Sequence, residues 1–303
     1  DGLKVYTTIN TQMQEYAEEG MAQHMTMLQK SIDTRLDMKT GSIWKKHENI
    51  LEKAAKESDR WKNGEEDGLS DKEIRASFDV KVQMKVFAWN SRREKDTVMT
   101  PMDSIKYHLQ MEQASFMAMD PVTGEVRAWV GGINFKTYKN DHVNLKTKRQ
   151  VGSTIKPFLY TQAMEERGFT PETDCENTAQ FFPGSGWVPS GRKCGGGIMS
   201  MANALAFSKN CATAYIMKQV GPRQFADFLH RISIPTEVKP FPSIALGTCD
   251  LSMYEMLWGY SLFAGRGFST KPYSISRIED RNGNVIKRFD YSVNRKEAIS
   301  EIT

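Results

Sequence analysis

Residues 149–160, RQVGSTIKPFLY, constrain the fold more than any other part of the chain. Beyond Gly152 the apolar residues recur at roughly helical spacing, which is typical of a helix with one buried face. Because proline lacks an N–H and is tolerated only in the first turn of a helix, Pro157 places the start of this helix close to Ser153. We therefore predict a buried helix whose first residue is Ser153.

Lys156 follows Ser153 by three residues, so both side chains project from the same face of the predicted helix, about one turn apart. A serine hydroxyl becomes a good nucleophile only when a base takes its proton, and a lysine serves when its surroundings lower its pKa. Backbone N–H groups at a helix start can also stabilise an oxyanion. Two other pairs share this spacing, Ser42 with Lys45 and Ser190 with Lys193. Those two are predicted to be solvated surface pairs, because only Ser153 stands between a glycine turn and an apolar helix.

The overall composition is that of a soluble chain with an ordinary core. Charged residues make up 26% and hydrophobic residues 39% of the 303 residues, which favours one large domain with an attached segment. The net charge of +4 is too even a balance to indicate nucleic-acid binding. No apolar run approaches the roughly 20 residues that a membrane helix needs. Since Asp1 is not a natural start, we expect the chain to be a piece of a longer protein.

The four cysteines show neither a Cys-x-x-Cys spacing nor clustered histidines, so we expect no metal site and no other cofactor. Cys175 and Cys194 bracket a loop that is rich in glycine, proline and serine. A disulfide between them would fit an oxidising compartment. Two buried free thiols are the alternative, and the sequence does not choose between these two states.

Periodicity predicts the remaining elements. We expect strands at residues 3–9 and 78–89, a helix capped by Asn10 or Thr11, and another helix over residues 105–111. Residues 31–69 are highly charged and predict an inserted, largely exposed helix. Two hairpins are indicated, one with apolar arms at residues 114–119 and 125–130 that should be central to a sheet, and one that turns at Asn282-Gly283. Residues 200–220 read as a helix that a polar turn, Ser208-Lys209-Asn210, interrupts.

Ser153-Thr154-Ile155-Lys156 followed by Ser208-Lys209-Asn210 resembles the first two motifs of penicillin-recognising serine enzymes. Residues 5–14, 117–132 and 245–267 resemble the transpeptidase domain of class A, bifunctional penicillin-binding proteins. The resemblance implies an α/β fold of the α+β type, with an antiparallel sheet flanked by helices. It also implies a linker region at residues 1–110, which holds the charged insertion, and a transpeptidase domain at residues 111–303 that is truncated at its C-terminus.

The resemblance further implies a peptidoglycan D,D-transpeptidase or carboxypeptidase that crosslinks stem peptides. Ser153 would form the acyl-enzyme and would also be acylated by β-lactams, with Lys156 as base. Ser208 would relay a proton to the leaving group, and Asn210 would hold the substrate amide and orient Lys156. Two residues are expected to line the substrate site, namely Gly152 and Trp187, the latter exposed in the glycine-rich loop over residues 181–197.

The same resemblance implies a place at the outer, periplasmic face of the cytoplasmic membrane in a bacterial cell envelope. The expected partners are stem peptides, β-lactams and cell-wall synthesis proteins, with no nucleic acid. Contact with the membrane would come only through an anchor upstream of this chain.

The family carries a third motif, Lys-Thr/Ser-Gly, on a strand after the second, and nothing after Asn210 supplies it. Lys39-Thr40-Gly41 matches the letters but precedes Ser153 in a charged segment, so we interpret it as coincidence and expect it to lie far from Ser153. Two alternatives remain, a β-lactam-hydrolysing enzyme with Glu165-Glu166 as its base and a catalytically silent wall-binding module. The four intact motif residues argue against the silent module.

Overall fold

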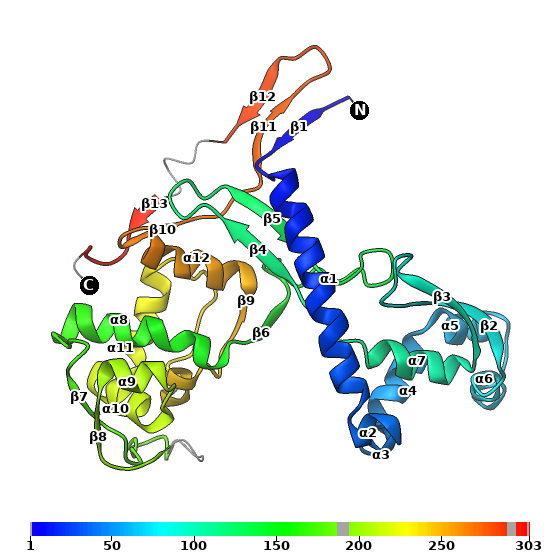
Figure 1. Cartoon of the computed structure of the whole chain (residues 1–303), viewed down its shortest axis with the longest axis horizontal. Helices are drawn as coiled ribbons and strands as arrows, with labels where there is room; N and C mark the ends of the chain where they lie inside the picture. The colour runs from blue at the N-terminus through cyan, green and yellow to red at the C-terminus, as the bar shows by residue number, and fades with distance from the viewer. Residues whose placement is uncertain (1, 187–193, 290–294, 302) are drawn as a thin grey trace. The chain divides into compact units, whose positions relative to one another are not determined.

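The stretch that carries Ser153 forms a 3₁₀ turn, η1 (Gly152–Ile155), which continues directly into helix α8 (Lys156–Arg167) in the computed structural model (Figure 1). Pro157 occupies the first turn of α8, as predicted. Ser153 therefore lies in the 3₁₀ turn just before the α-helix and is not the first residue of the α-helix. Gly168 caps the C-terminal end of α8, and its φ of 67° is left-handed, a conformation that glycine adopts at little cost.

The structure describes residues 2–186, 194–289, 295–301 and 303, and these divide into two units. Unit 1 consists of Asp1–Gln14, Phe116–Gly131 and Asp141–Thr303, and unit 2 of Glu15–Ser115 and Gly132–Asn140. Both units mix helices and strands, which confirms the predicted fold class. No helix in the described ranges has the length and apolar character needed to cross a membrane.

Unit 1 contains most of the strands and the helices around Ser153. Its further helices and 3₁₀ turns are α9 (Met201–Ala206), α10 (Asn210–Val220), α11 (Pro222–Arg231), η2 (Pro242–Leu246) and α12 (Met253–Ala264). Its strands are β1 (Lys4–Thr7), β4 (Phe116–Met119), β5 (Val126–Val130), β6 (Lys148–Gln150), β7 (Asp174–Glu176), β8 (Ile198–Ser200), β9 (Asp250–Ser252), β10 (Phe268–Thr270), β11 (Ile275–Glu279), β12 (Val285–Arg288) and β13 (Arg295–Glu297). The break between α9 and α10 is the polar turn that the sequence predicts.

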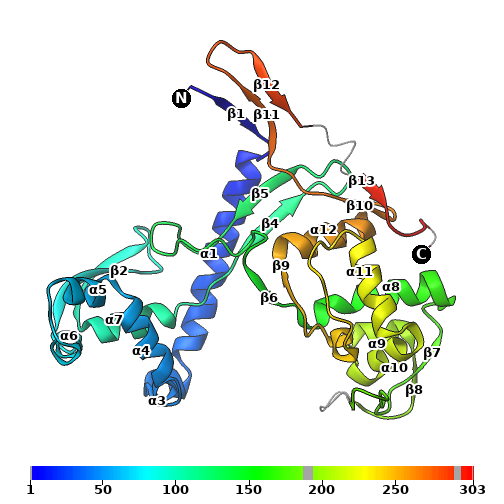
Figure 2. The ribbon, with the colours of Figure 1, turned by 180° about the vertical axis from the view of Figure 1, so that it is seen from behind.

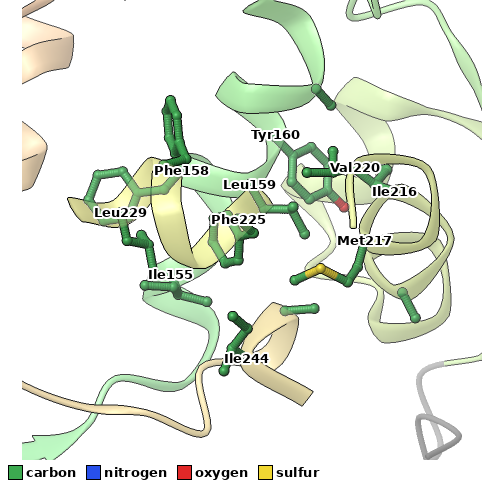
Figure 3. Close-up of a cluster of buried hydrophobic side chains, with 14 of the residues drawn as sticks. Ile155, Phe158, Leu159, Tyr160, Ile216, Met217, Val220, Phe225, Leu229 and Ile244 are labelled. Carbon is green, nitrogen blue, oxygen red and sulfur yellow. The ribbon is translucent and has the colours of Figure 1, made fainter. Parts of the chain in front are cut away.

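The larger core of unit 1 lies among η1, α8, α10, α11 and η2. Figure 3 shows apolar side chains from these elements pointing toward one another, each at most 2% exposed. They are Ile155, Phe158, Leu159, Tyr160, Ile216, Met217, Val220, Phe225, Leu229 and Ile244. Burying side chains of this size contributes roughly 1.5–3 kcal/mol each. The turn that carries Ser153 therefore rests on a densely packed base.

The strands of unit 1 form several small antiparallel ladders. Strands β1, β11 and β12 form a three-stranded sheet, whereas β4–β5, β6–β9, β7–β8 and β10–β13 are two-stranded. Both predicted hairpins are present, but β4–β5 is not central to a larger sheet in the described residues. Its buried Met117 and Val126 pack instead against Met253 and Leu257 of α12. The apolar residues of this hairpin are therefore covered by a helix, whereas the sequence predicted that neighbouring strands would flank the hairpin.

Helix α1 (Thr11–Asp33) passes from unit 1 into unit 2 and begins at the predicted cap, where the Met13 N–H donates to Asn10 Oδ1 at 3.0 Å. The remaining elements of unit 2 are α2 (Leu36–Lys39), α3 (Ser42–Lys46), α4 (Glu48–Glu57), α5 (Asp59–Glu66), α6 (Asp71–Ser77), β2 (Val82–Phe87), β3 (Glu94–Met99) and α7 (Pro101–Leu109). The charged segment is helical as predicted, but it forms several short helices. Part of their apolar surface is buried, since Trp61 is 3% exposed and packs with Ile74 and Phe78.

Candidate active site

Backbone pairing between two distant segments fixes the approach to Ser153. Strand β6 pairs with β9. Two further hydrogen bonds extend this pairing toward the turn, from the Val151 N–H to the Cys249 carbonyl at 3.1 Å and from the Gly152 N–H to the Gly247 carbonyl at 3.0 Å. The chain on both sides of Gly152 is thereby held by long-range contacts as well as by α8.

Gly247 is a residue of this site that sequence reasoning missed. A Cβ atom at Gly247 would meet the Gly152 carbonyl oxygen at 1.9 Å, so only glycine permits the two backbones to cross. Its φ of +74° also favours glycine. The stretch ALGTCDLS shows a glycine before a short strand, which hints at a special backbone position. That Gly247 contacts Gly152 could not be predicted from the sequence.

Lys156 is the buried centre of the site. It is 1% exposed, and its Nζ donates to the Ser208 carbonyl at 2.9 Å, to Ser208 Oγ at 3.1 Å and to Asn210 Oδ1 at 2.9 Å. A lysine ammonium carries three N–H donors, and the second motif supplies an acceptor for each of them. The structure thus brings together three of the four predicted catalytic residues.

The turn that carries Ser208 and Asn210 has an unusual backbone. Ser208 has a φ of 50°, in the left-handed region that few residues other than glycine adopt. The end of α9 holds this turn, because the Ser208 N–H donates to the Leu205 carbonyl and the Lys209 N–H to the Ala204 carbonyl, both at 2.9 Å. The turn aims the Ser208 carbonyl, the Ser208 hydroxyl and the Asn210 amide oxygen at one ammonium group.

Ser153 itself is exposed and precedes Lys156 by three residues in η1. Its hydroxyl makes no hydrogen bond to any other described residue, so the oxygen is free to meet a ligand from outside. A Cβ at Gly152 would touch nothing within 4 Å, which shows open space beside the same turn. Trp187 lies outside the described residues, and its place in a substrate site stays a prediction.

Tyr260 supports the turn from α12 and was also missed by sequence reasoning. Its hydroxyl donates to the Thr154 carbonyl at 2.7 Å, and its ring packs edge-on against Phe158 at a centroid distance of 4.9 Å. Burial raises the pKa of the Tyr260 phenol above its ordinary value, so the hydroxyl stays protonated and able to donate. The periodicity of α12 marks Tyr260 only as a helix residue, because its partner is a backbone atom far away in the sequence.

Neither Lys39 nor the two glutamates takes part in the contacts around Lys156. Lys39 is the last residue of α2 in unit 2, on a short helix and not on a strand, as predicted; its distance from Ser153 stays a prediction. Glu165 accepts hydrogen bonds from Ser300 and Thr303. Glu166 accepts one from Gln162 Nε2 at 2.8 Å and one from Arg231 at 2.6 Å.

Neither of the two states left open for Cys175 and Cys194 holds in full, because Cys194 forms a disulfide with a third cysteine. Cys194 pairs with Cys211, the second residue of α10, whereas Cys175 is a buried free thiol. Cys175 lies in β7 and its Sγ faces the Thr173 carbonyl at 3.6 Å, so its side chain is turned into the core. Burial raises the pKa of the Cys175 and Cys249 thiols to about 11, and both stay protonated at neutral pH. In the described ranges, no three histidine, cysteine, aspartate or glutamate side chains gather as a metal site would require.

Comparison with known families agrees with this geometry. A model described as the penicillin binding protein transpeptidase domain matches residues 114–303, and one described as the penicillin-binding protein middle domain matches residues 39–111. Because the first match covers more than half of the chain, the chain belongs to the penicillin-binding protein transpeptidase family.

Among individual relatives, the chain is similar to proteins named penicillin-binding protein 1A. It is 34% identical to the one from Vibrio cholerae over 177 residues, which are 56% of this chain and 21% of that protein. It is 31% identical to the one from Rickettsia prowazekii over 180 residues, 58% of this chain and 23% of that protein. The chain thus spans about a fifth of the length of these relatives.

Solved structures show the same fold. The crystal structure of penicillin-binding protein 1A from Haemophilus influenzae aligns with a TM-score of 0.54 and 26% identity, over 62% of this chain and 28% of that chain. The structure of the penicillin-binding protein PonA1 from Mycobacterium tuberculosis aligns over 99% of this chain and 60% of that chain, with a TM-score of 0.58 and 20% identity. At 20% identity, the match to PonA1 shows a shared fold and nothing more.

Proposed function

We propose that the chain carries a peptidoglycan D,D-transpeptidase site that works through a Ser153 acyl-enzyme and is acylated by β-lactams. The observation that carries the proposal is the set of contacts between buried Lys156 and the second motif, at 2.9, 3.1 and 2.9 Å. Burying a lysine is costly unless its ammonium is fully hydrogen-bonded. Because Lys156 is held in this way one helical turn from exposed Ser153, it can serve as a base beside a nucleophile.

In the first step, Ser153 Oγ attacks the carbonyl carbon of the penultimate D-alanine in a stem peptide. Lys156 first loses one ammonium proton to solvent, and the neutral amine then takes the hydroxyl proton while the new C–O bond forms. The C–N bond to the terminal D-alanine then breaks, and the leaving amine receives a proton through Ser208 Oγ, which lies 3.1 Å from Lys156 Nζ. Asn210 fixes the position of Lys156 throughout and offers its amide N–H₂ to the substrate backbone.

In the second step, the amine of a neighbouring strand attacks the ester carbonyl. The C–Oγ bond breaks, Ser153 regains its proton, and the new amide is the crosslink. Water in place of the amine would give the carboxypeptidase product. The open space beside Gly152 supports its proposed place next to the bound peptide.

The positions of Glu165 and Glu166 argue against a β-lactam-hydrolysing enzyme. Glu165 follows Ser153 by twelve residues along η1 and α8, which at ~1.5 Å per residue places the two roughly 18 Å apart along the axis. A base that activates water must lie within hydrogen-bond reach of the reacting atoms. Both carboxylates are also occupied by structural hydrogen bonds.

Replacing Glu166 tests that distinction. We expect Glu166→Gln to leave the lifetime of a penicillin adduct unchanged within about twofold, because the side chain serves Gln162 and Arg231 and not the acyl group. Adduct lifetime is measured by following the loss of a fluorescent penicillin from labelled protein. A lifetime extended a hundredfold or more would assign Glu166 to deacylation and favour the hydrolase.

Transfer to an amine tests the proposed reaction itself. The full chain is given a stem-peptide analogue that ends in D-Ala-D-Ala together with a labelled D-amino acid as acceptor. Exchange of the terminal D-alanine for the labelled residue, lost in Ser153→Ala, supports the transpeptidase. Release of D-alanine without exchange would restrict the activity to a carboxypeptidase.

The same proposal covers location and partners. Stem peptides and β-lactams are the proposed ligands, and the bacterial cell envelope, on the periplasmic side of the cytoplasmic membrane, is the proposed compartment. The Cys194–Cys211 disulfide supports an oxidising compartment. Cell-wall synthesis proteins are the proposed protein partners.

A further inference from the structure

The Cys194–Cys211 disulfide attaches a covalent bond to the residue that directly follows Asn210. We propose that this disulfide is a positioning element for the second motif, which holds the first turn of α10 so that Asn210 and Ser208 keep their contacts with Lys156. The inference rests on the proposed acyl-transfer function of Ser153. It assigns to the two cysteines a role in the reaction rate in addition to stability.

The local sequence does not secure this end of α10. The helix begins at Asn210, and its N-cap residue, Lys209, provides no side-chain hydrogen bond to the first N–H groups. A helix start without such a cap is prone to fray. The preceding Ser208 is left-handed, a conformation that a serine keeps only when its surroundings impose it. The end of α9 holds the turn itself, but the start of α10 that carries Asn210 has no side-chain cap, so a covalent tie at Cys211 would add to its support.

The disulfide supplies that support from a second element. Cys211 is fully buried, and its partner Cys194 comes shortly before β8. Strand β8 pairs with β7, and both views of the ribbon show this pair of strands beside α10 (Figures 1 and 2). The Cα atoms of the two cysteines are 5.3 Å apart, within the usual range for a disulfide. The first turn of α10 is thus tied to the segment that leads into β8, where the Gly196 N–H donates to the Asn177 carbonyl at 3.1 Å.

Small displacements at this turn should slow the reaction. Asn210 Oδ1 and Ser208 Oγ contact Lys156 Nζ at 2.9 and 3.1 Å, and misplacing reacting groups by about 1 Å can cost on the order of a hundredfold in rate. Reduction by a dithiol reagent breaks the S–S bond, adds two electrons and two protons to give two thiols, and oxidises the reagent to its own disulfide. We expect reduced protein to be acylated about ten- to a hundredfold more slowly at saturating penicillin.

The experiment follows acylation of the full chain by a fluorescent penicillin over time, before reduction, after reduction and after reoxidation. The acylation rate constant and the final labelled fraction are recorded separately, because lost folding lowers the final fraction whereas misplacement lowers the rate constant. The double variant Cys194→Ala/Cys211→Ala should be slow in every state with a full final fraction. The control Cys175→Ala removes a buried free thiol and should keep both the fast rate and its response to reduction.

Equal rate constants in oxidised and reduced protein would overturn the inference, even if the melting temperature fell, since the bond would then serve stability alone. A fall confined to the final labelled fraction would overturn it in the same way. If oxidised wild-type protein were not acylated by the fluorescent penicillin, the proposed function would be contradicted, and this inference with it.

Discussion

Replacing Lys156 by methionine is expected to lower the rate of acylation by a labelled penicillin by about 10²–10⁴-fold, the usual contribution of a general base. Methionine fills similar space but cannot take the Ser153 proton. It also leaves the Ser208 carbonyl and the Asn210 amide oxygen without their donor, so we expect a loss of roughly 1–3 kcal/mol in the free energy of unfolding. The measurements are time-resolved labelling and denaturant unfolding of the same preparation.

Lys218→Met is the matched control for this variant. Lys218 is an exposed residue of α10, the helix that begins at Asn210. Its replacement should change the free energy of unfolding by no more than about 0.5 kcal/mol and the acylation rate by no more than about twofold. If Lys156→Met were labelled as fast as wild-type protein, the lysine would be a structural residue and the base would have to be sought elsewhere.

The second large effect is expected from Gly247→Ala, far from Ser153 in sequence. The new methyl group would meet the Gly152 carbonyl oxygen at 1.9 Å, so the crossing between the two backbones must open. We expect acylation to slow by about a hundredfold, because the turn that carries Ser153 is displaced. The free energy of unfolding should fall by more than the ~1–2 kcal/mol that a left-handed alanine costs by itself.

Gly168→Ala separates backbone strain from the clash. Gly168 has a φ of +67°, close to the +74° of Gly247, but a Cβ there meets nothing within 4 Å. The Gly168→Ala variant should lose only ~1–2 kcal/mol in the free energy of unfolding and should keep the wild-type acylation rate. Equal effects of the two substitutions on labelling would show that the crossing at Gly152 has no special role.

Local patterns were sufficient to predict the elements that carry the site. Pro157 marks the first turn of α8, although the α-helix begins at Lys156 and not at the predicted Ser153. The cap at Asn10 and the hairpin turn at Asn282-Gly283 follow from short-range backbone chemistry. The break at Ser208 follows from a polar interruption in an apolar helix. In each case the cause lies within a few residues, which is the range over which periodicity and turn preferences act.

Long-range contacts account for what was missed. Gly247 supports Gly152 and Tyr260 supports Thr154 through backbone atoms, and no side-chain pattern marks such partners. Cys175 was considered as the partner of Cys194 because the two bracket a loop rich in glycine, proline and serine, and no local pattern marks Cys211 as the partner. Residues 31–69 are largely exposed, as predicted, but they form several short helices in place of one, and Trp61 packs with Ile74 and Phe78 from the following segment.

Even the convergence of Lys156 with Ser208 and Asn210 came from the family resemblance and not from periodicity. More than fifty residues separate the two motifs, and only the packing of α8 against α10 brings them together.

The most direct test of the central claim is to locate the penicillin adduct. The full chain is incubated with benzylpenicillin, digested with trypsin, and the peptide that begins at Gln150 is fragmented in a mass spectrometer. We predict one adduct with the mass of intact penicillin on Ser153, and none on the same peptide from Ser153→Ala. An adduct on Ser42 or Ser190, or wild-type protein that stays unmodified, would contradict the assignment of Ser153 as the nucleophile.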